Sequence, residues 1–330
     1  MLKLLDFAPM ESLGSVVFRR AHARLSSGVD RYFIAFVTPT REPHFTERQL
    51  REIAPEANVG FVAVPQLLTR RAEDFIWAAH ALADLGYREV NFNLGCPAGT
   101  VTAKGKGAGF LRSPDELERF FSSVFEKPLP IAVSLKTRLG WSDVSEFERL
   151  ADVFNHFPFA SVTVHARLKT DLYRGHARLD AFEDAVGLLV HPVIYNGDIV
   201  TDNDYESVIG RFPTLAGVMV GRGLIADPSL FRKLRGGKSA TAEEINQFTQ
   251  ELFEGYCRAW NNRKNALMRM KEYWFLLANL FAGDSKACFK AICRAKNESD
   301  YTSAVRSLLS QELLPHARMG WYKPLSDQDR

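Results

Sequence analysis

The sequence predicts an α/β protein, a (β/α)8 TIM barrel followed by a small all-α helical bundle. Three observations support this prediction. Short β-branched runs alternate with amphipathic helical stretches up to about residue 235, polar residues recur where these runs end, and no strand-like run follows the Gly-rich segment 235–242. We therefore expect a barrel domain over residues 1–235 and a helical domain over residues 243–320.

The composition is that of an ordinary globular protein, with 46% apolar and 25% charged residues among 330. The N-terminal apolar run is too short for a signal peptide and no uncharged apolar stretch of about 18 residues follows, so we expect a cytoplasmic protein without a membrane segment. The four cysteines form no CxxC pair and no zinc-like cluster with histidine, which predicts reduced thiols and no metal site. A net charge of +3 is too small to indicate a nucleic-acid partner by itself.

Eight strand-like runs fit a closed barrel, because such barrels typically take about 250 residues. An open, doubly wound sheet is disfavoured because no GxGxxG motif follows the first run. The expected strands are 3–8, 32–38, 60–66, 89–93, 130–136, 161–165, 192–195 and 216–220.

Amphipathic helical stretches separate these runs and continue after them. Ser113 followed by Pro114 predicts an N-cap with proline in the first turn, and Thr241 is a candidate N-cap after the Gly-rich linker. Apolar residues then recur at helical spacing up to Leu309, which predicts the bundle. Within the barrel the clearest helical stretches are 72–85, 114–125 and 146–157.

Polar or special residues end seven of the eight strand-like runs. In barrels of this kind the loops after the strands surround the mouth, where the chemistry collects. A polar residue at the end of a single strand is usually a solvated loop residue or a helix cap. Polar residues at the ends of seven strands together indicate a functional site. These residues are Pro9, Met10 and Glu11; Gln66; Asn93, Gly95 and Cys96; Lys136 and Arg138; His165 and Arg167; Asn196, Gly197 and Asp198; and Gly221, Arg222 and Gly223.

The glycines after the seventh and eighth runs lie where many barrels bind phosphate. Gly197 with Asp198, and Gly221 with Arg222, would let backbone N–H groups approach an anion. Glycines that only shape tight turns are the alternative. We interpret the two segments as the site of a phosphorylated cofactor.

Four further side chains suit a flavin ring. A fixed ammonium group at Lys136 would stabilise negative charge on a reduced isoalloxazine, and Gln66, His165 and Asn196 offer hydrogen bonds that orient such a ring. Each residue also has a structural explanation when it is considered alone. Lys136 could be a lysine whose aliphatic stem covers apolar surface, and His165 could be a histidine of the core.

Cys96 lies in NFNLGCPAGTVTAKGKGAGF, a segment rich in glycine and lysine. Buried cysteines usually behave as small apolar residues, but this composition indicates a loop at the mouth. Gly105, Gly107 and Gly109 remove steric limits on the backbone, which predicts a mobile loop. A thiol in such a loop acts as a nucleophile or as a general acid, and composition does not decide between the two.

Seven motifs together resemble the tRNA-dihydrouridine synthase family, in matching order and spacing across the whole barrel. The helical C-terminal part resembles the RNA-binding domain of that family. The segment RMKEYWFLL (269–277) and the short bundle look most like the bacterial dihydrouridine synthase C branch. The seven motifs are APM (8–10), NFNLGCP (91–97), GAGFL (107–111), LKTRLGW (135–141), HAR (165–167), NGDI (196–199) and VMVGRG (218–223).

The resemblance implies an FMN enzyme in which NADPH reduces the flavin and a D-loop uridine of tRNA is then reduced at its C5–C6 double bond. Cys96 matches the family's general acid, which gives a proton to uracil C5. Asn93 matches an asparagine facing flavin and uracil, and Arg167 a basic residue near the substrate. Resemblance to the C branch implies that the uridine at position 16 of tRNA is modified. Resemblance to the family implies a monomer. The matching flavin contacts are Pro9, Met10, Gln66, Lys136, His165, Asn196, Gly197, Asp198, Gly221 and Arg222.

Two places depart from the family pattern. Glu11-Ser12 stands where Glu-Gly is common, which leaves the chemistry unaffected. Ala35 stands where many members carry a glutamate in the second strand, so the resemblance does not define the substrate side of the mouth at that point.

Basic residues cluster in the predicted bundle. Residues 258–296 contain nine lysines and arginines against two acidic residues, a net charge of about +7 in a chain of net charge +3. Such clustering is the electrostatic footprint of a phosphate-backbone partner, although a charge run is often only a solvated face. We expect tRNA contacts from Arg269, Lys271, Lys286 and Arg294.

Two other functions remain open from the sequence. A small-molecule FMN oxidoreductase of the dihydroorotate-dehydrogenase type would share the barrel and the phosphate site, but would not need a basic helical domain. A non-catalytic RNA-binding protein that kept the barrel as a scaffold would not bind FMN.

Overall fold

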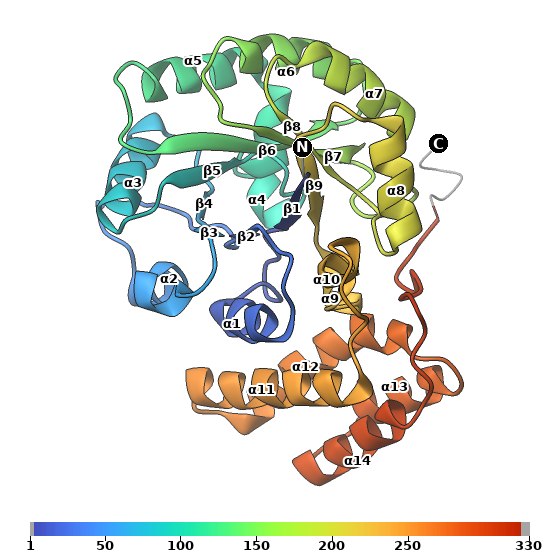
Figure 1. The fold of residues 1–330 in the computed structure, drawn as a ribbon. Coiled ribbons are helices and arrows are strands. Elements are labelled where there is room, and N and C mark those ends of the chain that lie inside the picture. The colour runs from blue at the N-terminus through green and yellow to red at the C-terminus, as the bar shows by residue number, and fades with distance from the viewer. Residues whose placement is uncertain (1–2, 325–330) are drawn as a thin grey trace.

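The computed structural model describes residues 3–324, and Figure 1 shows a barrel above a group of helices. Within that range one sheet runs in the order β3-β2-β1-β9-β8-β7-β6-β5-β4, and its paired strands are parallel. The strands are β1 (Leu4–Phe7), β2 (Arg31–Phe33), β3 (Ala63–Val64), β4 (Gln66–Leu67), β5 (Glu89–Asn93), β6 (Ala132–Gly140), β7 (Val162–Leu168), β8 (Val193–Asn196) and β9 (Gly217–Val220).

The sheet closes on itself at its third position, where a proline divides one strand into two. β3 pairs with β2, β4 pairs with β5, and only Pro65 separates them. Proline has no N–H group and interrupts the ladder, yet the Pro65 carbonyl oxygen still accepts from Asn91 N at 2.8 Å. The expected eight-stranded barrel is therefore confirmed, with its third strand in two halves.

Three strands differ in length from the expectation. β2 ends at Phe33 instead of residue 38, and a single bridge then joins Val37 to Leu67. β6 and β7 run on to Gly140 and Leu168 because they pair with each other beyond a bulge, so they extend past the expected ends at 136 and 165.

Helices surround the barrel in Figure 1. The helices expected at 72–85, 114–125 and 146–157 are confirmed to within two residues at their ends. Pro114 opens α5 as expected, although the Ser113 hydroxyl makes no capping bond. These elements are α1 (Val16–Leu25), α2 (Glu47–Ile53), η1 (Pro55–Asn58), α3 (Ala72–Asp84), α5 (Pro114–Val124), α6 (Glu146–Asn155), α7 (Leu179–Leu188), α8 (Asp202–Arg211), α9 (Arg222–Ala226) and α10 (Leu230–Leu234).

Alternation along the strands separates the outer core from the inside of the barrel. Phe7 points outward, and its ring lies 4.9 Å from that of Phe18 on α1. Its neighbour Asp6 points inward and binds Arg31 at 2.7 Å. Because side chains alternate along a strand, every second residue near the carboxyl ends faces the barrel axis.

The glycine-rich segment after β5 is folded. It forms α4 (Gly99–Thr102) and η2 (Gly107–Arg112), and most of η2 is buried. Gly107 has a φ of +55°, and a side chain there would lie 2.8 Å from the Cys96 carbonyl oxygen. At this position the glycine allows close packing around Cys96.

A second group of helices packs on one side of the barrel, with α11 against α1 and α12 against α9. Thr241 caps α11 through a capping box with Glu244, as expected. The linker that we propose between two domains, residues 235–242, lies between α10 and α11. The elements are α11 (Ala242–Trp260), α12 (Arg263–Leu277), η3 (Ala278–Leu280), α13 (Ser285–Arg294) and α14 (Glu298–Leu309).

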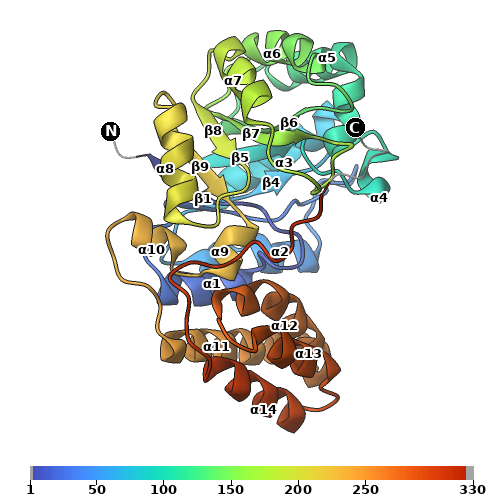
Figure 2. The ribbon, with the colours of Figure 1, turned by 90° about the vertical axis from the view of Figure 1, so that its right-hand side faces the viewer.

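The chain after α14 returns from these helices along the barrel (Figure 2). Near its described end, Lys323 accepts a backbone hydrogen bond from Gly175 N at 2.8 Å, beside the mouth. Among residues 3–324, no helix is both long and apolar enough to span a bilayer.

Candidate active site

A cavity of about 310 Å³ lies in the barrel mouth, where the strands end. This volume is at the lower end of the range for small-molecule sites. Thirteen residues were matched to the family's general acid, flavin contacts and substrate contacts at the mouth. Ten of them line the cavity, and the other three, Gln66, Arg167 and Asp198, lie behind that lining. The lining residues are Ala8, Pro9, Met10, Glu11, Phe36, Asn93, Gly95, Cys96, Lys136, Arg138, His165, Tyr173, Asn196, Gly197, Gly221 and Arg222.

A relay of buried amide side chains supports the cysteine loop. Gln66 Nε2 donates to Asn91 Oδ1 at 2.7 Å, and Asn93 Nδ2 donates to Gln66 Oε1 at 2.7 Å. The other polar atom of the last residue, Asn93 Oδ1, accepts from the backbone N–H of Cys96 at 2.9 Å. The relay therefore fixes the start of the cysteine loop from inside the barrel.

Cys96 keeps its proton at neutral pH. Burial raises the pKa of its thiol above the usual 9.0, and the Glu11 carboxylate acts in the same direction. The cations of Lys136 and Arg138 act in the opposite direction without reversing the shift. A nucleophilic thiolate needs a lowered pKa, whereas a general acid must hold its proton until the reaction; the raised pKa is compatible with the second of these two roles.

The Lys136 ammonium group lies inside the barrel. Its Nζ donates to Asn196 Oδ1 at 2.8 Å. Burial, with the Arg138 guanidinium nearby, lowers the pKa of Lys136 from 10.5 to about 7. A lysine that only covers apolar surface would carry its nitrogen to solvent, so that alternative does not hold. An anion in the cavity would favour the protonated amine.

His165 is neutral and is held by Arg167. Arg167 Nη1 lies 3.3 Å from His165 Nε2, and because a guanidinium group only donates, the ring proton is on Nδ1. Burial, then the nearby cations, lower the pKa of His165 well below 6.5. Arg167 is itself buried and binds Asp198 at 2.6 Å, so it supports the cavity from behind.

The expected phosphate segments combine tight glycines with a guanidinium group. A side chain at Gly197 would collide with the Tyr195 hydroxyl, and one at Gly221 would lie 2.8 Å from Met10 Sδ. Gly197 therefore has no room for a side chain, and one at Gly221 would have to displace the Met10 side chain, so both glycines keep the backbone at the cavity wall. Arg222 adds a cation to the same wall. Close backbone and a fixed cation are the features of an anion site.

Tyr173, after β7, is a lining residue that the sequence patterns did not single out. Its ring is 50% exposed and lies 5.3 Å from the Arg138 guanidinium and 5.2 Å from that of Arg222. Trp321, on the returning C-terminal segment, lies 5.9 Å from the same Arg222. Arg138, by contrast, was among the expected strand-end residues, and it follows Lys136 by two residues on the same side of the strand.

The four basic residues expected to contact tRNA lie on α12 and α13, outside the cavity lining. Lys286 and Arg294 are exposed. Arg269 binds its neighbour Glu272 at 2.5 Å. Lys271 Nζ donates to two carbonyl oxygens at the end of α13, at 2.9 and 2.8 Å, so this ammonium group also stabilises that helix end.

Comparison with known proteins gives one consistent family. A family model described as "Dihydrouridine synthase (Dus)" matches residues 6–306. The tRNA-dihydrouridine(16) synthase of Cupriavidus necator is 35% identical over 241 residues, which cover 70% of this chain and 73% of that relative. The tRNA-dihydrouridine(16) synthase of Neisseria meningitidis serogroup B is 27% identical over 322 residues, 92% of this chain and 93% of the relative.

Among solved structures, the crystal structure of TcOYE with pHBA matches with a TM-score of 0.51. The match covers 76% of this chain and 93% of the other at 11% identity. At that identity the likeness concerns the barrel fold alone.

Replacing Lys136 by methionine tests the buried ammonium group. Below about pH 7 the amine is protonated in the folded and the unfolded chain, so the full penalty of its burial is present. Between about pH 7 and 10.5 only the unfolded chain holds the proton, so this group makes the free energy of unfolding rise with pH. Lys136→Met lacks the group and therefore this rise.

We expect the free energy of unfolding of the wild type, minus that of Lys136→Met, to rise by roughly 1 kcal/mol per pH unit above pH 7. Urea unfolding of the ligand-free proteins at about pH 7, 8 and 9 measures this difference. A difference that stays constant over that range would contradict a pKa near 7.

Proposed function

This chain belongs to the dihydrouridine synthase family, and on that basis we propose a role in cofactor binding, substrate binding or proton transfer for each residue of the site. It is a flavin-dependent tRNA-dihydrouridine synthase that takes electrons from NAD(P)H. The observation that carries our assignment of roles is the cavity in the barrel mouth, where ten of the expected residues meet. Cys96 is the one residue of this lining that carries a thiol.

FMN fits the chemistry of the cavity wall. Its phosphate requires a cation and close backbone, which Arg222 and the glycines beside it provide. Its ring requires hydrogen-bond partners and a cation, which Lys136, His165 and Asn196 provide. When bound, FMN supplies the hydride that reduces the uracil ring. The contacts that we assign are Pro9, Met10, Lys136, His165 and Asn196 for the ring, and Gly197, Gly221 and Arg222 for the phosphate. Gln66 and Asp198, also expected as flavin contacts, would support this wall from behind, through Asn93 and Arg167.

We assign the proton of the reduction to Cys96. Its S–H bond breaks as a C–H bond forms at uracil C5, and the sulfur keeps the electron pair as a thiolate. Burial keeps the thiol protonated until the base is in place. The cations of Lys136 and Arg138 favour the thiolate that remains. Asn93 holds the backbone of the donor through Cys96 N.

The substrate side of the cavity includes an exposed aromatic ring. A base of folded tRNA must leave its stack to enter a barrel mouth, and unstacked bases commonly stack on aromatic side chains. We assign this role to Tyr173, which is half exposed between two guanidinium groups. Asn93 faces the base from the cavity wall. Arg167, buried behind His165, acts on the substrate by holding the wall.

We propose that the second group of helices provides the surface that binds the tRNA backbone. Lys286 and Arg294 are exposed on α13, and Arg269 and Lys271 lie on the adjacent α12. Position 16 is the uridine that we propose, because several relatives are tRNA-dihydrouridine(16) synthases. We further propose a cytoplasmic monomer that uses NADPH.

Cys96→Ala should separate the two halves of the reaction. Reduction of the flavin by NADPH should keep its rate, while dihydrouridine formation should slow by roughly 10²- to 10⁴-fold, the contribution of a positioned acid. Cys288→Ala is the matched control, since Cys288 is also partly buried but lies on α13. Stopped-flow flavin absorbance and analysis of digested tRNA measure the two rates. Unchanged dihydrouridine formation in Cys96→Ala would refute the assignment.

Neutralising Arg269, Lys286 and Arg294 together with glutamine should weaken tRNA binding and flatten its salt dependence. Each lost phosphate contact lowers the slope of log K against log salt by about 0.7–0.9. Filter binding at several salt concentrations measures the slope, and flavin reduction by NADPH should not change.

The control variant also loses three positive charges, but from the surface of the barrel. In it the exposed Arg48, Arg51 and Arg119 are replaced by glutamine. This variant should bind tRNA with nearly the wild-type slope. Equal slopes in the two variants would rule out the surface on α12 and α13.

A further inference from the structure

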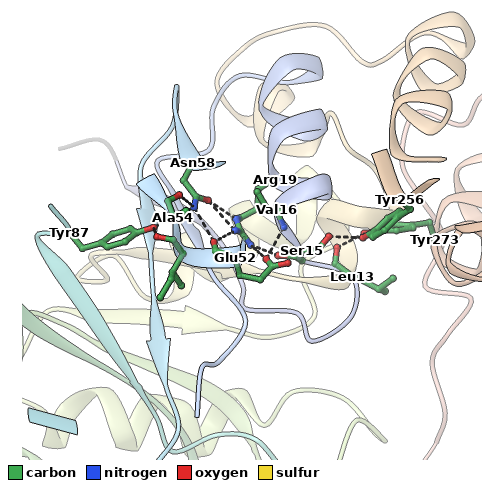
Figure 3. Close-up of polar contacts among 12 residues, drawn as sticks. Leu13, Ser15, Val16, Arg19, Glu52, Ala54, Asn58, Tyr87, Tyr256 and Tyr273 are labelled. Carbon is green, nitrogen blue, oxygen red and sulfur yellow. Dashed lines mark hydrogen bonds and ion pairs between the residues drawn. The ribbon is translucent and has the colours of Figure 1, made fainter. Parts of the chain in front are cut away.

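A chain of hydroxyl groups joins the barrel to the second group of helices (Figure 3). Ser15 Oγ, at the start of α1, lies 2.6 Å from Tyr256 Oη on α11. Tyr256 Oη lies 2.7 Å from Tyr273 Oη on α12, and both tyrosines are buried. Tyr273 Oη then donates to the carbonyl oxygen of Leu13 at 2.7 Å, so the chain returns to the barrel.

One arrangement of hydrogens satisfies this chain. The Leu13 carbonyl only accepts, so the single hydroxyl hydrogen of Tyr273 is used there. Tyr273 must therefore accept from Tyr256, and Tyr256 must accept from Ser15. Each hydroxyl group depends on the next, and buried networks of this kind are costly to break in part.

Ser15 takes part in this chain instead of in its usual local role. It is the N-cap of α1, where a serine normally accepts from a backbone N–H in the first turn, but it makes no such bond. The Glu52 carboxylate accepts from Val16 N at 2.8 Å in its place. Because another residue caps α1, the Ser15 hydroxyl is available for Tyr256.

A buried arginine holds the same loop from the barrel side. Arg19 Nη1 donates to the Gly14 carbonyl oxygen at 2.7 Å and to Glu52 Oε2 at 3.1 Å. Its other donors reach Glu52 O and Asn58 Oδ1, so the guanidinium group is fully satisfied. The Leu13 carbonyl group is therefore fixed by Tyr273 of α12 (Figure 3), and the next carbonyl group, that of Gly14, is fixed by Arg19 of α1.

The loop held in this way forms one wall of the active-site cavity. Gly14 N donates to the Met10 carbonyl oxygen at 2.7 Å, which closes a turn that carries Met10 and Glu11 in the lining. Within the turn Ser12 has a φ of +73°, in the left-handed region that residues other than glycine avoid. Such a conformation persists only where its surroundings hold it.

The middle of the hydroxyl chain, at Tyr256, approaches the surface assigned to tRNA. The Tyr256 ring lies 4.7 Å from that of Trp260, which is 41% exposed at the end of α11. The guanidinium group of Arg269 lies 5.6 Å from the Trp260 ring. RNA bound at Arg269 would therefore lie one ring away from the hydroxyl chain.

We propose that Tyr256 and Tyr273 are positioning residues, through which the helices set the position of the loop 9–14 against the cavity for the reduction step. This inference rests on the proposed function, because it takes α12 to hold tRNA and the loop to contact the flavin. It requires the Tyr273 hydroxyl to affect the chemical step more than the affinity for tRNA.

Tyr273→Phe removes the bond to Leu13 and keeps the ring, which stacks 5.8 Å from that of Phe18. We expect the holoenzyme variant, reduced with NADPH and mixed with saturating unmodified tRNA, to reoxidise about two- to tenfold more slowly, as expected for one lost hydrogen bond. Its dissociation constant for the tRNA should stay within about twofold of the wild-type value.

Tyr301→Phe is the matched control. Tyr301 is buried on α14 and its hydroxyl accepts from Trp274 Nε1 at 2.9 Å, but it has no described bond to the barrel. It should keep both the wild-type rate and the wild-type affinity. If Tyr273→Phe does not fold, Ser15→Ala breaks the same chain at its other end and should slow the same step.

Either of two rate measurements would overturn the inference alone: a wild-type rate in both Tyr273→Phe and Ser15→Ala, or an equal loss of rate in Tyr301→Phe. Weakened tRNA binding with an unchanged saturating rate would do the same. A wild-type enzyme whose flavin stays reduced with tRNA bound would overturn the proposed function and this inference together.

Discussion

The active site depends on the register of one closed parallel sheet. Asn93 lies beside Lys136 in the ladder between β5 and β6. His165 lies beside Asn196 in the ladder between β7 and β8. Because side chains alternate along each strand, a slip of one residue would turn these groups out of the barrel and into its apolar shell. The barrel closes at Pro65, where the ladder lacks one N–H donor. The strand register around the whole barrel depends on this closure.

That register brings together more positive charge than the mouth can neutralise by itself. Burial lowers the pKa of Lys136 to about 7 and that of Arg138 to about 10. An anionic cofactor would relieve this cost, so cofactor binding should stabilise the fold. In the role that we propose for Cys96, the same cations favour the thiolate that remains when the proton has been given up. One electrostatic feature would then serve both cofactor binding and proton transfer.

Local periodicity and strand ends were enough to predict the barrel, its helices and most of the cavity lining. Tertiary contacts were not predictable in this way. Tyr173 reaches the mouth between two arginines from other strands, and Trp321 arrives from the far end of the chain. Phe36 lines the cavity and follows Ala35, the position where many family members carry a glutamate. Charge counting found the basic helices, but it could not show that Lys271 binds the carbonyl groups that end α13.

The claim that the barrel mouth reduces one defined uridine of tRNA is tested most directly by an anaerobic titration. Purified enzyme with FMN is reduced by NADPH, freed of excess reductant and mixed with an unmodified tRNA transcript. We expect the flavin to reoxidise, with one dihydrouridine formed per flavin and located at position 16. Flavin that stays reduced while the tRNA is bound, or that reoxidises without forming dihydrouridine, would contradict this claim.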